Sequence, residues 1–148
     1  MATAIVIKEY GGSNVLQAEE VSVGSPAEGQ IRIRQTGIGI NFHDAYVRSG
    51  LYKTLSLPGI PGCEAVGIIQ EVGEGVSGFS VGDRIAYVTG TYGAYASERL
   101  LDANLALPVP DALPDALVAT NLLRAMTVDM LVAQVAKVSA GDTILVQA

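Results

Sequence analysis

The sequence predicts a mostly β protein with short helices, in which a glycine-rich β region leads into a helical segment and one last apolar strand. Short runs of β-branched and apolar residues alternate with glycine-rich turns over about the first 105 residues. Aromatic residues make up only 5% of the chain while glycine occurs 17 times, which favours tight turns over a helical bundle. Beyond this region, apolar residues recur at helical spacing.

The β region contains one short helix among its strands. Residues 30–36 alternate apolar and polar, which is the pattern of a half-buried strand. Phe42, Ala45, Tyr46 and Ser49 carry helical spacing and end on Gly50, so we expect a helix over residues 42–50. Expected strands cover residues 3–7, 16–21, 30–36, 65–72, 84–88, 94–99 and 104–107.

The pattern changes after Pro108, Pro110 and Pro114. Helical spacing runs from Asp115 to about residue 137, and Thr127 could cap a second of two successive helices. Residues 143–148 then form an apolar run typical of a buried parallel strand. Such a strand needs neighbours and a crossover helix, so we expect a truncated chain. Its open edges predict that it is disordered, paired with another chain or packed in a non-native way.

Composition and charge argue against several classes of partner. The net charge is −6 and the nine basic residues are scattered, which argues against nucleic acid and anionic membrane surfaces. No uninterrupted apolar run reaches the roughly 20 residues that span a bilayer, and the N-terminus does not resemble a signal peptide. The single cysteine, Cys63, excludes an internal disulfide and suits a reducing cytoplasm.

Three stretches together resemble a known family. They are residues 37–52, residues 61–67 with 72–76 and 79–85, and residues 93–96 running into 108–111. In this order they resemble the GroES-like catalytic domain of the medium-chain dehydrogenase/reductase superfamily, and the first stretch resembles its zinc-free quinone oxidoreductase branch. The resemblance implies a GroES-like partly open β-barrel at residues 1–123. It further implies a connecting helix at 124–142 and, at 143–148, the first strand of a truncated Rossmann nucleotide-binding domain.

The residues do not suit the catalytic zinc of related alcohol dehydrogenases. Those enzymes have a cysteine at the position of Asn41, a histidine at that of Cys63 and a further cysteine near Leu123. A substitute site from His43, Asp44, Cys63 and Glu64 is disfavoured, because His43 and Asp44 are neighbours that point in different directions on a helical turn. We therefore expect no metal.

The resemblance implies transfer of a hydride from NADPH to a quinone, with Asn41, Tyr46 and Tyr52 as catalytic residues. Each has a simpler interpretation. Asn41 could cap the helix that starts at Phe42, Tyr46 could be a packed aromatic residue, and Tyr52 could face solvent in its loop.

The same resemblance implies a set of cofactor contacts. Most contacts with NADPH would lie outside this chain, so we expect the fragment itself to be inactive. Thr127 again has a helix cap as its simpler interpretation. The implied contacts within the chain are Asn41, Phe42, His43, Asp44, Tyr46, Thr127 and Met130.

Other polar residues are expected to have structural roles. Arg48 is expected to be a solvated or salt-bridged surface residue. Cys63 is expected to be a small buried residue rather than a nucleophile. Glu64 is expected to form structural hydrogen bonds.

The leading hypothesis is therefore an NADPH-dependent quinone reductase that acts in the cytoplasm as a homodimer on a small-molecule quinone. Two alternatives stay open. One is a zinc-free enoyl or alkenal reductase of the same superfamily, and the other is a non-enzymatic GroES-like binding module.

Overall fold

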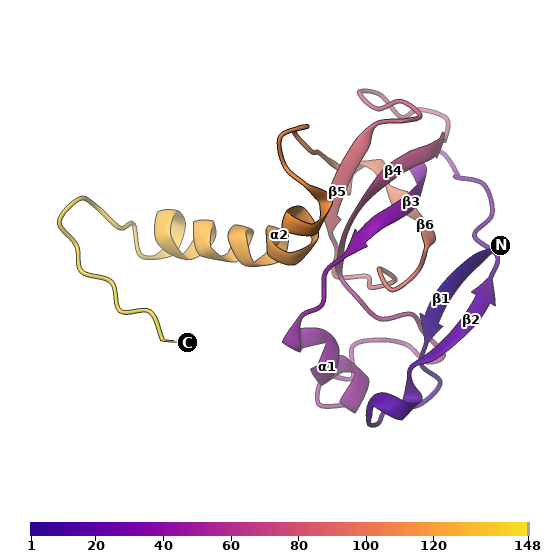
Figure 1. Ribbon diagram of the computed structural model, residues 1–148, viewed down its shortest axis with the longest axis horizontal. Helices are drawn as coiled ribbons and strands as arrows, with labels where there is room; N and C mark the ends of the chain where they lie inside the picture. The colour runs from indigo at the N-terminus through magenta and orange to yellow at the C-terminus, as the bar shows by residue number, and fades with distance from the viewer. Residues whose placement is uncertain (148) are drawn as a thin grey trace.

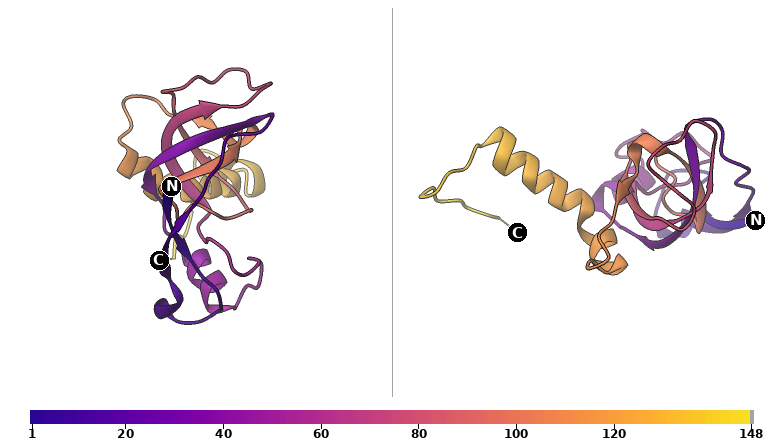
Figure 2. Two further views of the ribbon diagram at one scale, coloured as in Figure 1. Left: turned by 90° about the vertical axis from the view of Figure 1, so that its right-hand side faces the viewer. Right: turned by 90° about the horizontal axis from the view of Figure 1, so that it is seen from above.

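The computed structural model describes residues 1–147 and shows a β-rich body from which one helix and a C-terminal tail project (Figure 1). Seen from above, the same helix again leads away from the strands (Figure 2). The mostly β fold with short helices is therefore confirmed.

The strands form two open sheets. β1 (Ala2–Val6) pairs antiparallel with β2 (Gln17–Val21) in a two-stranded sheet. The second sheet has the order β6-β3-β4-β5-β7, and its pairs are also antiparallel. Its strands are β3 (Gln30–Ile38), β4 (Glu64–Val72), β5 (Arg84–Val88), β6 (Glu98–Asp102) and β7 (Leu107–Pro108).

The main core lies on one face of the five-stranded sheet. Ile31 and Ile33 alternate with exposed or half-buried residues on β3, as the sequence pattern predicts, and both are fully buried. Ile69, Ile85 and other apolar residues of neighbouring strands complete this cluster. A second cluster packs α1 (Phe42–Ser49) against the loops below the sheet, with Val47 at its centre. The body thus holds α1 rigidly at one end of the sheet.

Some expected elements differ at their boundaries. The helix expected at 42–50 is confirmed, because Gly50 takes a left-handed conformation that ends it. The strand expected at 94–99 begins only at Glu98, preceded by a single bridge between Ala4 and Ala96. The strand expected at 104–107 is wrong, because the Asp102 carboxylate accepts a hydrogen bond from the Asn104 N–H and starts a short 3-10 helix, Ala103–Leu105.

The helical segment is continuous and starts earlier than the expected connecting helix. α2 spans Asp115–Asp129 and passes into a π-helical turn, Met130–Val135. Thr127 therefore lies inside α2 and is not a cap, because its hydroxyl donates to the Leu123 carbonyl one turn earlier. Residues 136–142 are not helical.

The strand expected at 143–148 is absent from residues 143–147, which are exposed and belong to no helix or strand; Ala148 lies outside the described residues. A strand needs a neighbour for its backbone hydrogen bonds, and none is present in this part of the chain. In the described chain one helix, Asp115–Val135, is long and apolar enough to span a bilayer by length and composition alone. The expected absence of a membrane partner therefore stays a prediction.

Candidate functional site

The N-terminus of α1 sets the position of Asn41. Asn41 is the residue before the helix and has an extended backbone, and its N–H donates to the Asp44 carboxylate at 2.8 Å. The simpler interpretation of Asn41 as a helix cap is therefore confirmed at the level of the backbone. The amide nitrogen of the Asn41 side chain bonds outside the helix.

The side chain of Asn41 is bound by Glu64, the first residue of β4. Nδ2 of Asn41 donates to Oε1 of Glu64 at 2.7 Å, and Oε2 of Glu64 accepts from the backbone N–H of Leu123 in α2 at 2.7 Å. Glu64 is only 1% exposed. The structural hydrogen bonding expected of Glu64 is thus confirmed, and its carboxylate joins α1, β4 and α2.

Gly39 makes this junction possible. A Cβ atom on Gly39 would lie 2.3 Å from the Ala119 carbonyl oxygen and 2.5 Å from Oε1 of Glu64. Both distances are far below van der Waals contact, so a side chain at this position would displace α2 or the Glu64 carboxylate. The close approach explains why the chain turns on a glycine just before Asn41.

Aromatic rings gather on α1 and on the loop that follows it. The Tyr46 ring lies 5.4 Å from the Tyr52 ring in an edge-on arrangement and 6.4 Å from that of Phe42. His43 joins the group, with its ring 5.7 Å from that of Tyr52. Phe42 is 83% exposed, and Tyr46 and Tyr52 are also exposed. We call Phe42, His43, Tyr46 and Tyr52 the aromatic cluster; it is an open, partly apolar surface with polar groups at its edge.

His43 connects the aromatic cluster with the interior. Its ring stacks on that of Tyr92 at 5.9 Å, and its Nε2 lies 3.1 Å from the Tyr92 hydroxyl. The same hydroxyl lies 2.5 Å from Oγ1 of Thr54. Tyr92 and Thr54 were not among the predicted site residues, because both come from loops whose sequence gives no sign of this contact.

Asp44 faces the opposite way from His43 and is buried. Its Oδ2 accepts from the Tyr95 hydroxyl at 3.0 Å, in addition to the Asn41 N–H, and its Oδ1 lies 3.8 Å from Sγ of Cys63. Its side chain therefore lies behind α1. The adjacent residues His43 and Asp44 do point in different directions.

Cys63 is buried, as expected, and its surroundings disfavour the thiolate. Burial, together with the nearby Asp44 and Glu64 carboxylates, raises the pKa of the thiol to about 12. Burial and Asp44 also raise the pKa of Tyr95. The thiol is thus protonated at neutral pH, which is unfavourable for a nucleophile or a metal ligand. Among residues 1–147 no three His, Cys, Asp or Glu side chains gather in a geometry that could hold a metal ion.

The remaining predicted residues lie apart from the aromatic cluster. Thr127 and Met130 are exposed on α2 and its π-helical extension, and no hydrogen bond or aromatic contact joins either of them to α1 within the described chain. Arg48 differs from its expected role. It forms no ion pair within residues 1–147, and its Nε is buried without a partner.

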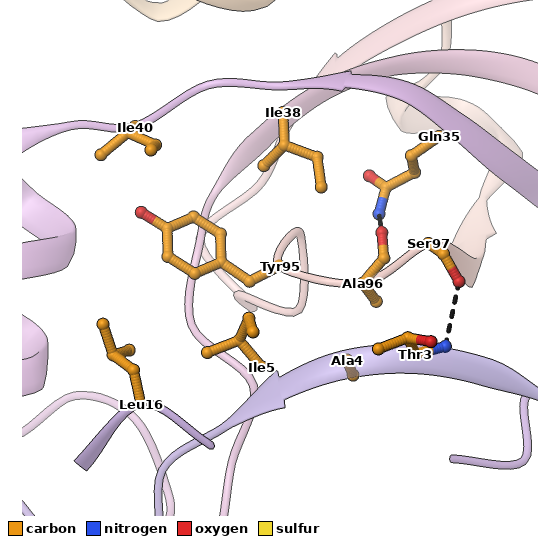
Figure 3. A pocket seen from close by; sticks show the side chains of 10 residues that line it. All are labelled: Thr3, Ala4, Ile5, Leu16, Gln35, Ile38, Ile40, Tyr95, Ala96 and Ser97. Carbon is orange, nitrogen blue, oxygen red and sulfur yellow. Dashed lines mark hydrogen bonds between the residues drawn. The ribbon is translucent and has the colours of Figure 1, made fainter. Parts of the chain in front are cut away.

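An apolar groove lies on the other side of Tyr95 from Asp44. Figure 3 shows that Ile5, Ile38 and Ile40 surround the Tyr95 ring, with Gln35 and Ser97 at one end. The cavity has a volume of about 520 Å³. A smaller cavity of about 160 Å³ shares Ile40 and Tyr95 with it and reaches Asn41 and Arg48. The aromatic cluster lines neither cavity, whereas Asn41 and Asp44, two other predicted site residues, line the smaller one.

Comparison with known proteins identifies the fold and its relatives. Residues 27–111 match the alcohol dehydrogenase GroES-like domain. The whole chain is 40% identical to a quinone oxidoreductase of Salmonella typhimurium and 41% identical to a 2-haloacrylate reductase of a Burkholderia species. It covers 45% and 46% of these relatives, so it spans less than half of their length.

A solved structure agrees with these matches. The structure of Escherichia coli quinone oxidoreductase complexed with NADPH aligns with a TM-score of 0.86 at 41% identity, over 89% of this chain and 40% of that one. The chain therefore belongs to the alcohol dehydrogenase GroES-like family, and its relatives are quinone oxidoreductases of the medium-chain dehydrogenase/reductase superfamily.

Proposed function

We propose that this chain is the N-terminal, substrate-side part of a longer enzyme that transfers a hydride from NADPH to a quinone. The observation that carries the proposal is the exposed aromatic cluster on the helix that Asn41 caps, together with the amide of Asn41 that Glu64 orients. Exposed rings suit a flat, apolar ring substrate, because aromatic faces and edges pack against it at low entropic cost. The relatives named above include quinone oxidoreductases, one of them solved with NADPH.

Asn41 offers one hydrogen-bond donor to the reaction. Its Nδ2 carries two hydrogens, and Glu64 takes one of them. The second N–H is available to the substrate oxygen that gains charge or to the carboxamide of the nicotinamide. Because Glu64 fixes the amide, this donor is oriented before substrate binds.

The residues present fit a nicotinamide cofactor in part. Phe42 and Tyr46 form an open apolar face next to the Asn41 amide, which is suitable for one side of a flat ring. When bound, the cofactor supplies the hydride, and this chain supplies orientation and a donor. Thr127 and Met130 would contact it only if the cofactor extends along α2. Asp44 would contribute from the buried side of α1 and not by direct contact with the cofactor, since its carboxylate is buried.

A reaction without metal is part of the proposal. A quinone needs no Lewis acid for hydride addition, and the buried, protonated Cys63 thiol is a poor ligand. We further propose that the longer enzyme is a cytoplasmic homodimer and that residues 1–148 alone are inactive.

The test is turnover by the full-length protein. It should oxidise NADPH in the presence of a small quinone, with no loss of rate after treatment with a chelator. Asn41→Ala should lower kcat/KM by about 10-fold or more, which corresponds to the loss of one oriented donor. A rate that depends on added zinc, or an Asn41→Ala variant as active as the wild type, would contradict the proposal.

The similarity to a 2-haloacrylate reductase favours a second candidate, reduction of an activated carbon–carbon double bond. The same assay distinguishes the two. A kcat/KM for enals or acrylates above that for every quinone tested would establish the second function. No NADPH binding by the full-length protein would instead favour the non-enzymatic module.

A further inference from the structure

We propose that Thr54, Tyr92 and His43 form a proton relay that carries a proton from solvent to the substrate oxygen after hydride transfer. This inference rests on the proposed function, because the relay serves a reaction that leaves a negatively charged oxygen. It adds two residues, Thr54 and Tyr92, that the sequence motifs do not single out.

The three side chains form an unbroken hydrogen-bonded path. The Tyr92 hydroxyl lies 2.5 Å from Oγ1 of Thr54 and 3.1 Å from Nε2 of His43. Both distances are within hydrogen-bonding range for these groups. The path runs from an exposed threonine, through a tyrosine that is 6% exposed, to a half-buried histidine at the aromatic cluster. Its two ends are therefore solvent and the proposed substrate surface.

The backbone of Tyr92 supports a specific role for its hydroxyl. Tyr92 has φ = 60°, in the left-handed region that side-chain-bearing residues rarely adopt. Such a conformation costs roughly 1–3 kcal/mol and persists only where the surroundings impose it. Packing against Ile7, Val47 and Leu55 holds the ring in place. The strained residue is the one whose hydroxyl joins the other two groups.

The relay fixes the tautomer of His43. If Thr54 donates to the Tyr92 oxygen and Tyr92 donates to Nε2, the single proton of a neutral imidazole is on Nδ1. No hydrogen bond to Nδ1 occurs within the described chain, so this N–H is free to donate to a substrate. Tyr52, another member of the aromatic cluster, has its ring 5.7 Å from the imidazole.

The proton transfer balances without any further reagent. When bound, the reduced nicotinamide would supply the hydride, and its addition to the quinone would leave an oxyanion. The Nδ1–H proton of His43 moves to that oxygen, and the O–H bond of the hydroquinone forms. The Tyr92 proton moves to Nε2, the Thr54 proton moves to the Tyr92 oxygen, and solvent returns a proton to Thr54. The relay ends neutral, with the imidazole in its other tautomer, and reversal of the hydrogen bonds resets it.

The decisive variant is Tyr92→Phe in the full-length protein. It removes the hydroxyl but keeps the ring, its burial and its stacking on His43. We expect kcat for quinone reduction to fall by about 10-fold or more, with KM within about 2-fold of the wild type, because general acid catalysis contributes to the transition state and not to binding. Thr54→Val should lower kcat in the same direction, whereas Thr54→Ser should retain it.

Tyr87→Phe is the matched control. Tyr87 is fully buried; its hydroxyl donates to Gln35 and accepts from Arg99, whose guanidinium also donates to the Tyr92 carbonyl. The variant therefore perturbs the surroundings of Tyr92 without removing a hydroxyl of the relay. This variant should lose stability while keeping kcat. If Tyr92→Phe lowers kcat no more than Tyr87→Phe does, the hydroxyl is structural and the relay is wrong.

Chemical rescue tests the histidine itself. His43→Ala should be slow, and added imidazole should restore part of its rate, because a free imidazole can occupy the vacated position and donate a proton. No rescue, together with wild-type kcat in His43→Gln, would overturn the relay.

A measurement without turnover separates this inference from the proposed function. Nitrogen NMR of His43 should show the Nδ1–H tautomer in the wild type and a mixture of tautomers in Tyr92→Phe. An Nε2–H tautomer in the wild type would overturn the relay even in an active enzyme. A wild-type enzyme that reduces neither quinones nor enones would overturn the proposed function, and with it the catalytic role of an otherwise intact hydrogen-bonded path.

Discussion

The β-rich body and the C-terminal arm, residues 115–147, are both rich in apolar residues but differ in what those residues contact. In the body, isoleucines, valines and leucines of several strands are fully buried against one another. In the arm only Val118 and Ala119 are buried, where the first turns of α2 pack on Val66 and Ala86. The arm beyond these residues carries a largely exposed apolar surface. Apolar spacing therefore predicts the strands of the body and the helix of the arm alike, but burial depends on whether a partner is present.

The largest expected effect is on the free energy of unfolding, and a matched pair of leucine truncations measures it. Leu101→Ala in the core of the body should lower the free energy of unfolding by about 2–5 kcal/mol, because it leaves a cavity among well-packed neighbours. Leu131→Ala in the exposed arm should change it by no more than about 0.5 kcal/mol. Urea unfolding of residues 1–148 measures both, and equal losses would mean that the arm is packed in solution.

The second effect is a loss of stability at alkaline pH, and it arises in the body only. The pKa of the Cys63 thiol is raised from 9.0 to about 12, so the native state keeps its proton where the unfolded state releases it. The stabilisation is fully present below pH 9 and is lost progressively as the pH rises from 9 towards about 12. Cys63→Ala should flatten the fall of unfolding free energy with pH in this range. Identical slopes for the two proteins would show that the thiol does not contribute.

The third effect concerns the junction between body and arm. Glu64→Gln should lower the free energy of unfolding by about 1–3 kcal/mol, because the glutamine amide directs a donor at either Asn41 or the Leu123 N–H. Hydrogen exchange at the Leu123 amide should accelerate. The control is Glu74→Gln, an exposed carboxylate on a turn, which should change neither quantity appreciably. Unchanged exchange at Leu123 would mean that Glu64 does not hold α2.

The smallest effect is expected at the first residue of α2. The Thr36 hydroxyl and then the Arg84 guanidinium lower the pKa of Asp115, and Nε of Arg84 lies 2.6 Å from its carboxylate. A lowered pKa means that this stabilisation is present above the ordinary value near 3.8 and is lost as the pH falls through the native value. Asp115→Asn should cost at most about 1 kcal/mol at neutral pH, because the pair is partly exposed. The difference from wild type should disappear in acid.

Local patterns in the sequence predict the elements of the body well. The alternation along β3 and the Gly50 stop of α1 are both local, and the structure agrees with them. The strand expected at 104–107 fails because one side-chain hydrogen bond from Asp102 competes with strand pairing. The strand expected at 143–148 fails because a strand requires a neighbour that the sequence pattern cannot supply.

The candidate site could be predicted only where its residues are close in sequence. Asn41, His43 and Tyr46 share one helix and its cap, so their proximity follows from helical spacing. The contacts of His43 with Tyr92, and of Glu64 with Leu123, join residues 49 and 59 positions apart. No local pattern encodes such pairs, and the left-handed backbone of Tyr92 is imposed by its tertiary surroundings.

The Glu64 junction has a mechanical consequence. One carboxylate oxygen of Glu64 accepts a hydrogen bond from the Asn41 amide, and the other accepts one from the backbone of α2 at Leu123. α2 and its π-helical extension continue from Leu123 to Val135, which at about 1.5 Å per residue is a lever of roughly 18 Å. A tilt of the far end is transmitted through a rigid helix to a carboxylate that cannot move without turning the amide of Asn41. A change in the direction of α2 would therefore change the orientation of the Asn41 amide.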